Sequence, residues 1–159
     1  MSSDDPFSDK EIIRFEDGRY VGEVQGAIRH GRGKFTMWSG DEYEGDFHLN
    51  KMQGKGTYRY KNGDVYVGTW KGDKRSDFGR MEYASGDTFE GNWSSDVKRG
   101  PGTLHFKEGG RYVGTWENGE PLPDGKYYND DGDRYEGEFK DLRRHGTGVS
   151  KNADGSVYE

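Results

Sequence analysis

Residues 43–65 have the sequence YEGDFHLNKMQGKGTYRYKNGDV, and its spacing returns along the chain. The unit Tyr-x-Gly-x-aromatic opens this stretch, and in each copy we number positions from its first residue, position 0. Glycine occupies positions 2, 13 and 20 in every copy. A fixed period of this kind is typical of a repeat architecture. Position 0 recurs every 23 residues, at Tyr20, Tyr43, Tyr66, Phe89, Tyr112 and Tyr135.

Within each repeat the pattern alternates with period 2, which indicates β-strands. Positions 0, 2 and 4 lie on one face of a first strand, and positions 13, 15 and 17 on one face of a second. Each repeat is therefore predicted to be a β-hairpin, with a looser turn over positions 5–12 and a tight glycine turn over positions 18–22. The strand glycines are expected to leave room for a neighbouring ring, because glycine otherwise weakens a strand.

The composition agrees with an aromatic-rich β structure and disfavours several other classes. Only 28% of residues are hydrophobic, yet the 159 residues include 27 Gly, 11 Tyr, 8 Phe and 4 Trp. This aromatic content argues against disorder, and this glycine content argues against a helix bundle. No apolar run is long enough for a spanning helix. A net charge of −6 disfavours nucleic-acid binding.

The repeat resembles the MORN repeat (membrane occupation and recognition nexus). The hallmark of that family is Tyr-Glu-Gly-x-aromatic followed by His-Gly-x-Gly, and residues 135–139 (YEGEF) and 145–148 (HGTG) match it. The resemblance covers residues 20–157. It implies an all-β fold, namely an elongated, twisted, single-layer antiparallel sheet of successive β-hairpins.

The repeats divide the chain into three parts. Residues 1–19 are expected to form an N-terminal tail with a capping strand, and residues 158–159 begin a seventh unit. Exposed end strands would allow a homodimer. The six repeats span residues 20–42, 43–65, 66–88, 89–111, 112–134 and 135–157.

Several positions depart from the pattern. Position 11 is usually Gly but is Asp77 in the third repeat and Pro123 in the fifth, and Val24 replaces the ring at position 4 of the first. The fifth repeat also contains Pro121, so its long turn is expected to be reshaped.

A single layer with rings on one face is expected to leave an aromatic groove that receives a helix or peptide of a partner protein. The alternative is that these rings stack on one another and form the core. The predicted groove consists of Tyr43, Phe47, Tyr58, Tyr60, Tyr66, Trp70, Tyr83, Phe89, Trp93, Phe106, Tyr112 and Trp116.

Charge is segregated by position, because positions 5–12 are net positive and positions 18–22 net negative. A basic edge would face anionic lipid or an acidic protein surface, or else it is a solvated edge. The acidic edge would include Asp41, Asp64 and Asp87. The predicted basic edge consists of Arg29, Arg32, Lys51, Lys55, Lys74, Arg75, Lys98, Arg99, Arg143 and Arg144.

No set of residues predicts an enzyme, a cofactor or a metal site. The chain has no Cys, which removes disulfides and thiolate metal sites and fits a reducing, cytoplasmic compartment. His30 and His145 occupy the same repeat position five repeats apart, so they cannot share a metal. The N-terminal residues lack the features of a signal peptide.

The predicted function is therefore a non-enzymatic protein-binding scaffold. Small stand-alone MORN arrays resemble radial spoke heads and other ciliary or cytoskeletal components, which implies a location in the cytoskeleton, at the axoneme of a cilium or flagellum. The alternative from another class is a peripheral membrane module that binds acidic phospholipid through the basic edge.

Overall fold

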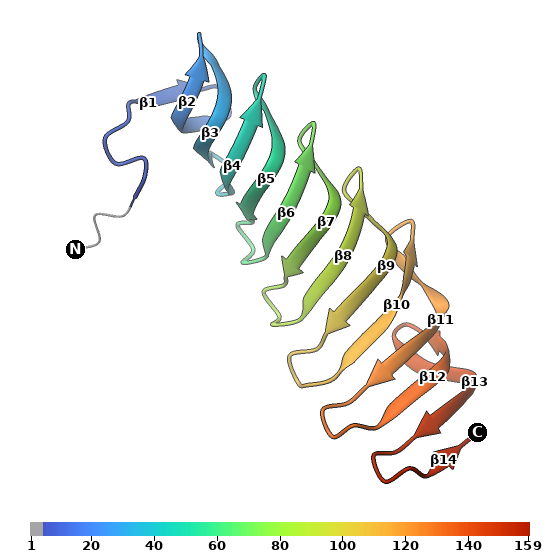
Figure 1. Ribbon diagram of the computed structural model, residues 1–159. Helices are drawn as coiled ribbons and strands as arrows, with labels where there is room; N and C mark the ends of the chain where they lie inside the picture. The colour runs from blue at the N-terminus through green and yellow to red at the C-terminus, as the bar shows by residue number, and fades with distance from the viewer. Residues whose placement is uncertain (1–4) are drawn as a thin grey trace.

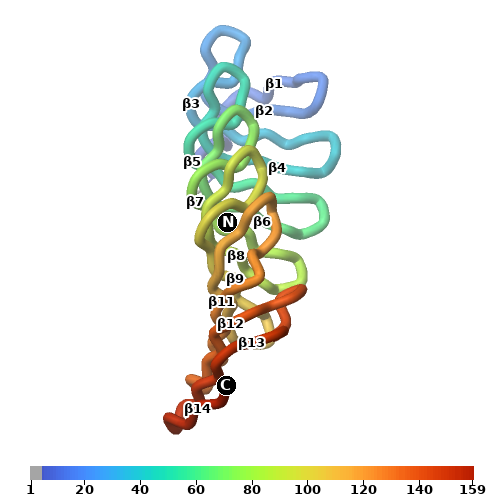
Figure 2. Tube along the Cα trace, turned by 90° about the vertical axis from the view of Figure 1, so that its right-hand side faces the viewer, coloured from blue at the N-terminus to red at the C-terminus, as the bar shows by residue number. Residues whose placement is uncertain are grey.

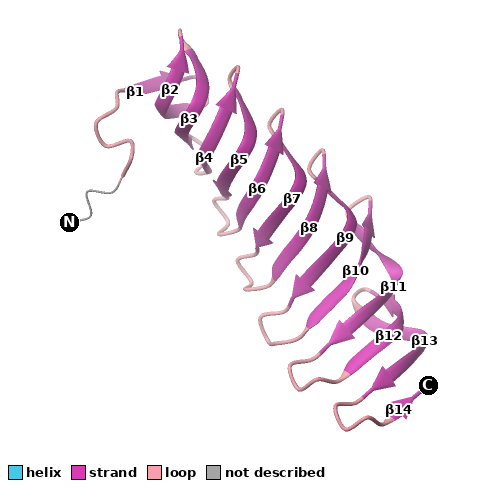
Figure 3. Ribbon diagram, in the orientation of Figure 1, coloured by secondary structure: helices cyan, strands magenta, loops and turns pink. Residues whose placement is uncertain are grey.

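The computed structural model describes residues 5–159, and these form a single fourteen-stranded antiparallel sheet (Figure 1). The strands are hydrogen-bonded in chain order, so each pairs with its neighbours in sequence. The first and last strands lie at opposite ends of an elongated layer, and Figure 2 shows that the layer twists along its length. Figure 3 shows strands and connecting loops, without helices, over the described range. This architecture confirms the predicted fold class.

Two strands form each repeat, and the residues before the first repeat supply an additional strand. The segment Ile12–Phe15 pairs with the strand that contains Tyr20. Residues 1–4 of the predicted tail lie outside the described range. The strands are β1 Ile12–Phe15, β2 Gly18–Gln25, β3 Ile28–Met37, β4 Glu42–His48, β5 Lys51–Arg59, β6 Val65–Lys71, β7 Lys74–Glu82, β8 Thr88–Ser94, β9 Val97–His105, β10 Arg111–Glu117, β11 Glu120–Tyr128, β12 Arg134–Lys140, β13 Arg143–Lys151 and β14 Val157–Tyr158.

The hairpin turn is tighter than the sequence predicted. Only Leu49 and Asn50 connect β4 to β5, with φ values of 47° and 71°. Positive φ at both residues is the geometry whose twist matches that of paired strands. Residues 51–55, which were predicted to belong to a loose turn, instead extend β5. The prediction was wrong because a bulge between Gly45 and Phe47 lets the two strands continue pairing beyond the glycines.

The connection between repeats has the predicted length of five residues but begins one residue earlier, at position 17. Residues 60–64 form a loop in which the Tyr60 N–H donates to the Asp64 carbonyl (2.9 Å) and the Gly63 N–H donates to the Tyr60 carbonyl (3.0 Å). Gly63 has a φ of 101°, so glycine is needed at position 20 as the sequence indicated. We call the side of the sheet with the two-residue turns the hairpin edge and the side with these loops the loop edge.

Glycine at positions 2 and 13 creates the space that holds each repeat together. Gly45 and Gly56 are paired across β4 and β5, and the ring of Tyr43 lies over both. A Cβ atom at Gly56 would overlap Cζ and Oη of Tyr43. The Tyr43 hydroxyl donates to the carbonyl of Asp46 (2.9 Å), which belongs to the bulge. The expected role of the strand glycines is thus confirmed.

On the hairpin edge, a side chain in each turn of the second, third and fourth repeats is hydrogen-bonded to the previous repeat. The Arg29 N–H donates to Asn50 Oδ1 (2.8 Å), and the Arg75 N–H donates to Asp96 Oδ1 (2.9 Å). Asp73 Oδ1 accepts from the Met52 N–H in the same way (2.8 Å). These bonds satisfy backbone N–H groups of the previous repeat, which would otherwise be hydrogen-bonded only to water.

On the loop edge, aspartates at position 21 make the corresponding link to the next repeat. Asp41 Oδ1 accepts from the Lys61 N–H (2.8 Å), and Asp64 Oδ1 accepts from the Ala84 N–H (2.8 Å). Asp87 and Asp133 bind Lys107 N–H and Ala153 N–H at 2.9 Å and 2.8 Å. The predicted acidic edge is therefore a row of structural caps.

The row of side-chain links on the hairpin edge is interrupted at the fifth repeat. Pro121 has no N–H to donate, and Leu142 in the facing turn has no side-chain acceptor. On the loop edge Gly110 replaces the aspartate of Asp41 and its equivalents, and the link runs in the opposite direction, from the Gly110 N–H to Asp130 Oδ1 (3.1 Å). Pro123 does not reshape its own turn, because Gly114↔Gly125 and Trp116↔Pro121 keep the usual register. Instead, the pairing of β11 with β12 starts only at Asp124, the residue after Pro123.

We expect Gly56→Ala to destabilise the fold by about 3 kcal/mol, because the added methyl group overlaps the Tyr43 ring and the paired backbone leaves little room for relaxation. Urea unfolding followed by circular dichroism measures the change. Gly100→Ala is the matched control: its φ is 82°, but the new methyl would meet no heavy atom within 4 Å, so it should cost only about 1–2 kcal/mol of backbone strain. Equal losses would contradict the steric argument.

We expect the amides shared by β11 and β12 to exchange with deuterium faster than those shared by β7 and β8, because β11 and β12 lack the hairpin-edge link that Arg75 and Asp96 make. The double substitution Pro121→Arg with Leu142→Asp copies the Arg75–Asp96 link and should increase protection by about 1 kcal/mol. Hydrogen exchange read by mass spectrometry checks both statements. Uniform protection along the sheet would show that the fifth repeat is not weakly joined.

Candidate partner-binding face

The rings at positions 0 and 4 form a continuous stack along the array. Tyr43 meets Phe47 of its own repeat at 5.1 Å between ring centroids and Trp70 of the next repeat at 5.5 Å, with interplanar angles of 87° and 84°. The same edge-to-face contacts continue from Tyr20 to Phe139. Such pairs favour this geometry and each contributes about 1 kcal/mol beyond area burial.

This stack corrects the predicted groove. Eight of its twelve rings belong to the core cluster, with at most 5% of their surface exposed, so they cannot line an open groove: Tyr43, Phe47, Tyr66, Trp70, Phe89, Trp93, Tyr112 and Trp116. The alternative of a stacked core holds for these rings. The other four rings are half-buried, and they are Tyr58, Tyr60, Tyr83 and Phe106. We call the side of the sheet that carries all these rings the ring face, and the opposite side the polar face.

The predicted basic edge is also divided. Position 9 lies on the ring face, and its cations lie over the rings: Arg29 is 4.4 Å from the Phe35 centroid, and Arg75 is 4.6 Å from that of Trp93. Lys98 and Arg144 do the same over Phe89 and Tyr135. The strand extension at positions 8–12 explains this, because it directs position 9 towards the rings. The remaining six are exposed: Arg32, Lys51, Lys55, Lys74, Arg99 and Arg143.

Arg75 and Lys98 differ in how they are held. The Arg75 Nε atom lies 3.0 Å from Asp96 Oδ1, and its Nη2 donates to the Asp96 carbonyl, which fixes the guanidinium. Lys98 Nζ lies 5.2 Å from the Tyr83 centroid and has no ion pair among residues 5–159. Burial, and secondarily Arg75, lowers the pKa of the Lys98 ammonium. Glu120 opposes this shift in pKa, but within residues 5–159 no carboxylate lies within ion-pair distance of Lys98, which is thus a half-buried cation without a close counter-ion.

A hollow of about 470 Å³ lies over these residues on the ring face. It extends from the 60–64 loop to the Asn118-Gly119 turn, and Tyr60, Tyr83 and Lys98 line its middle. The Tyr58 hydroxyl donates to Asp41 Oδ2 (2.7 Å), but those of Tyr60 and Tyr83 have no hydrogen-bond partner in the described part of the chain. Burial raises the pKa of both phenols, so they remain donors at neutral pH.

The polar face carries alternating charges. Lys34 pairs with Glu42 and Lys126 with Glu136, each at 3.4 Å. Phe78 is 59% exposed on this face, in a hollow of about 620 Å³, and sequence reasoning missed it. Its place at position 12, where the two preceding repeats have Arg32 and Lys55, was the signal that could have identified an outward-facing ring.

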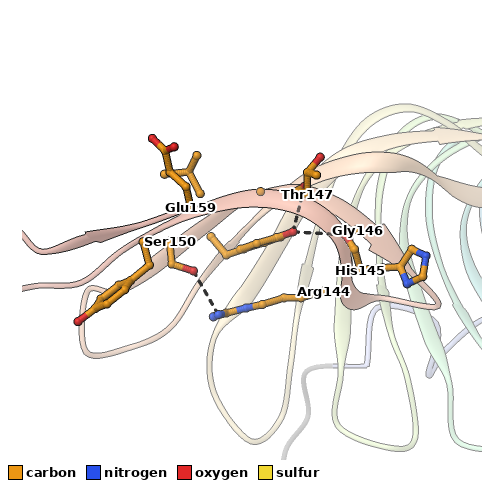
Figure 4. Close-up of a pocket in the computed structure, with 10 residues that line it drawn as sticks. Arg144, His145, Gly146, Thr147, Ser150 and Glu159 are labelled. Carbon is orange, nitrogen blue, oxygen red and sulfur yellow. Dashed lines mark hydrogen bonds between the residues drawn. The ribbon is translucent and has the colours of Figure 1, made fainter.

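Figure 4 shows a third hollow, of about 990 Å³, at the last repeat. Residues of β13 and β14 line it together with Tyr135, and Arg144 Nη1 donates to Ser150 Oγ (3.4 Å). The labelled side chains include no pair of acids and no nucleophile next to a base, so this hollow has no evident catalytic chemistry.

The structure brings two histidines together that the sequence did not pair. The rings of His30 and His48 have centroids 4.7 Å apart, and His30 Nδ1 accepts from the Leu49 N–H (3.3 Å). Within residues 5–159, no three His, Asp or Glu side chains are grouped so that they could hold a metal ion. In the same range, no helix has the length and apolar character to cross a membrane.

Comparison with known proteins identifies the repeat and the fold. The family model for the MORN repeat matches residues 20–41, 43–65, 66–88, 89–111, 112–122 and 135–157. No curated protein matches the chain. Among solved structures, the TCP domain of SAS-4 (dCPAP) of Drosophila melanogaster, in complex with a proline-rich motif of Ana2 (dSTIL), is similar with a TM-score of 0.58 and 15% identity. The match covers 99% of this chain and 92% of that one, and at this identity it shows the fold alone.

We expect the fold to be lost at alkaline pH as the stacked tyrosines ionise. Burial raises the pKa of Tyr20 to about 12, and it also raises the pKa of Tyr43 and Tyr66. A phenol in the unfolded chain has a pKa of about 10, so this stability is complete below pH 10 and is lost as the pH rises towards 12.

Tyrosinate absorbance and circular dichroism, followed over the same titration, should change together for the stacked rings. Tyr66→Phe should unfold at a higher pH than the unchanged chain, because it removes one ionising group and a ring without a hydroxyl, Phe89, already fits at position 0. Ionisation of all tyrosines with the sheet intact would contradict this prediction.

Proposed function

The chain belongs to the MORN-repeat family, and on this basis we propose that it is a non-enzymatic scaffold that holds a partner protein on its ring face and joins it to a cytoskeletal assembly. The observation that supports this role most strongly is the hollow lined by Tyr60, Tyr83 and Lys98. Partly exposed tyrosines next to a cation are the side chains that most often anchor a protein partner.

The buried stack explains why this face can bind a partner without losing its shape. The eight core rings stack on one another, and the turns and loops are linked from repeat to repeat. Tyr60 and Tyr83 are therefore presented by a preformed surface, which lowers the entropy lost on binding.

The similar fold of the SAS-4 TCP domain supports a peptide as the partner. That domain is in complex with a proline-rich motif of Ana2, so a domain of similar fold binds a motif of another protein. By analogy, we propose that the present chain also binds a segment of its partner rather than a whole folded domain.

We further propose that the assembly is the axoneme of a cilium or flagellum. The resemblance of small MORN arrays to radial spoke heads supports this location. The alternative is a peripheral membrane module, and it is favoured by the exposed cations at the hairpin edge, which include Lys51, Lys74 and Arg143. Each such cation near an anionic membrane contributes about 1 kcal/mol.

Extraction of ciliated cells with mild detergent tests the proposal. We expect the tagged protein to stay in the insoluble cytoskeleton and the double variant Tyr60→Ala with Tyr83→Ala to be released, because it loses both anchoring rings. Phe78→Ala is the matched control, since it removes an exposed ring from the polar face and should leave retention unchanged.

Thermal unfolding of the purified variants shows whether they remain folded. Release of the unchanged protein together with lipid, and its binding to phosphatidylserine vesicles in low but not high salt, would support the membrane alternative instead. Retention of a folded Tyr60→Ala, Tyr83→Ala variant would rule out the ring face as the site of attachment.

A further inference from the structure

Half-buried rings form a column along the ring face. Tyr60, Tyr83 and Phe106 occupy position 17 in three consecutive repeats, and Met37 and Asn129 occupy it on either side. Successive rings are two strands apart, which is about 9.6 Å in an antiparallel sheet. The column therefore offers an aromatic surface at a regular interval over three repeats.

The backbone beneath this column is not available to a ligand. The strands β2 to β13 are each hydrogen-bonded on both sides, so a peptide lying across this face cannot add to the sheet as a strand. Contacts must instead come from side chains. The hydroxyls of Tyr60 and Tyr83, which have no acceptor among residues 5–159, can donate to carbonyl groups of an occupant.

The period of the column fits a polyproline II helix better than an α-helix. A polyproline II helix repeats every three residues, about 9.3 Å. Across the two intervals between three rings, its repeat and the ring spacing therefore differ by a total of only about 0.6 Å. An α-helix returns to the same face after seven residues, about 10.5 Å, and falls out of step by about 2 Å. The α-helix also uses its carbonyls internally, whereas those of polyproline II are free to accept.

The charge of the hollow defines the second feature of an occupant. Two carboxylates line the hollow, and both are occupied: Asp96 holds Arg75, and Asp64 accepts from the Ala84 N–H and from Asn62 Nδ2. Lys98 Nζ lies over the rings of Tyr83, Phe89 and Trp93 without an ion pair in the described residues, and Glu120 acts on it only from beyond ion-pair distance. A half-buried ammonium group of this kind favours an anionic partner group. In a partner segment that lies over Tyr83, an acidic residue next to the part in contact with this ring would place its carboxylate near Lys98.

Building on the protein-binding role above, we propose that the ring face binds a proline-rich, acidic segment of about nine residues in the polyproline II conformation. The segment lies along Tyr60, Tyr83 and Phe106, with one turn over each ring and a carboxylate near Lys98. This assigns the direction, the conformation and the charge of the partner, none of which follows from the scaffold role alone.

Fluorescence anisotropy with a labelled peptide of four Pro-Pro-Glu triplets tests the proposal, because its carboxylates recur once per turn. The matched probes are four Pro-Pro-Lys triplets, which reverse the charge, and four Gly-Ser-Glu triplets, which keep the charge without the polyproline conformation. We expect the full chain to bind Pro-Pro-Glu about tenfold more tightly than either probe.

Substitutions then locate the site. Tyr83→Ala and Lys98→Gln should each weaken the binding of Pro-Pro-Glu about tenfold, and Lys98→Gln should also reduce its salt dependence. Phe78→Ala and Lys55→Gln change a ring and a cation on the polar face and should leave affinity unchanged. Tyr83→Phe removes only the hydroxyl, so it separates the hydrogen bond from the ring contact if Tyr83→Ala is unstable.

The proposal is overturned if Pro-Pro-Glu does not bind, if Gly-Ser-Glu binds equally well, or if an amphipathic helical peptide binds the ring face in its place. In each of these cases the scaffold role still stands, provided that the Tyr60→Ala, Tyr83→Ala variant is released from the cytoskeleton. Failure of both experiments would remove the scaffold role as well.

Discussion

The contact of one tyrosine ring with a pair of facing glycines underlies the whole structure. Because Gly45 and Gly56 have no side chains, the ring of Tyr43 lies flat across two strands, and its hydroxyl binds the carbonyl that the bulge leaves free. The ring then meets an aromatic residue on either side, Phe47 and Trp70. Each repeat is thus joined to the next through its largest side chains, and a single layer acquires a core without a second layer to cover it.

This way of building a core determines what remains for binding. The rings at positions 0 and 4, which carry the family signature, are buried in the stack. The rings available to a partner are those at position 17, directly after the second strand, such as Tyr60 and Tyr83. Cations at position 9 complete the cover over the stack, and Lys98 does so without an ion pair in the described range. The same arrangement that buries the core therefore presents a lined, charged hollow beside it.

The fold could be predicted from the sequence because its determinants are local and repeated. Alternation with period 2 and the recurring glycines specified strands, hairpins and the room for rings. The turns were assigned the wrong way round, because the bulge after Gly45 adds residues to the strand that spacing alone assigns to a loop. The same error made the predicted basic edge too large. It placed Arg75 and Lys98 in a turn at the edge, whereas the longer second strand directs their side chains over the rings.

The sequence by itself determined the repeat, the class of fold and the family, because each depends on residue types at fixed intervals. Only the tertiary structure decided which rings are core and which are open, since burial depends on contacts between different repeats, such as that of Tyr43 with Trp70. It also decided that Asp41 and its equivalents cap the neighbouring loop and that the side-chain links of the hairpin edge stop at the fifth repeat. Those features depend on hydrogen bonds that join residues about twenty positions apart, and a one-dimensional pattern of charges does not contain them.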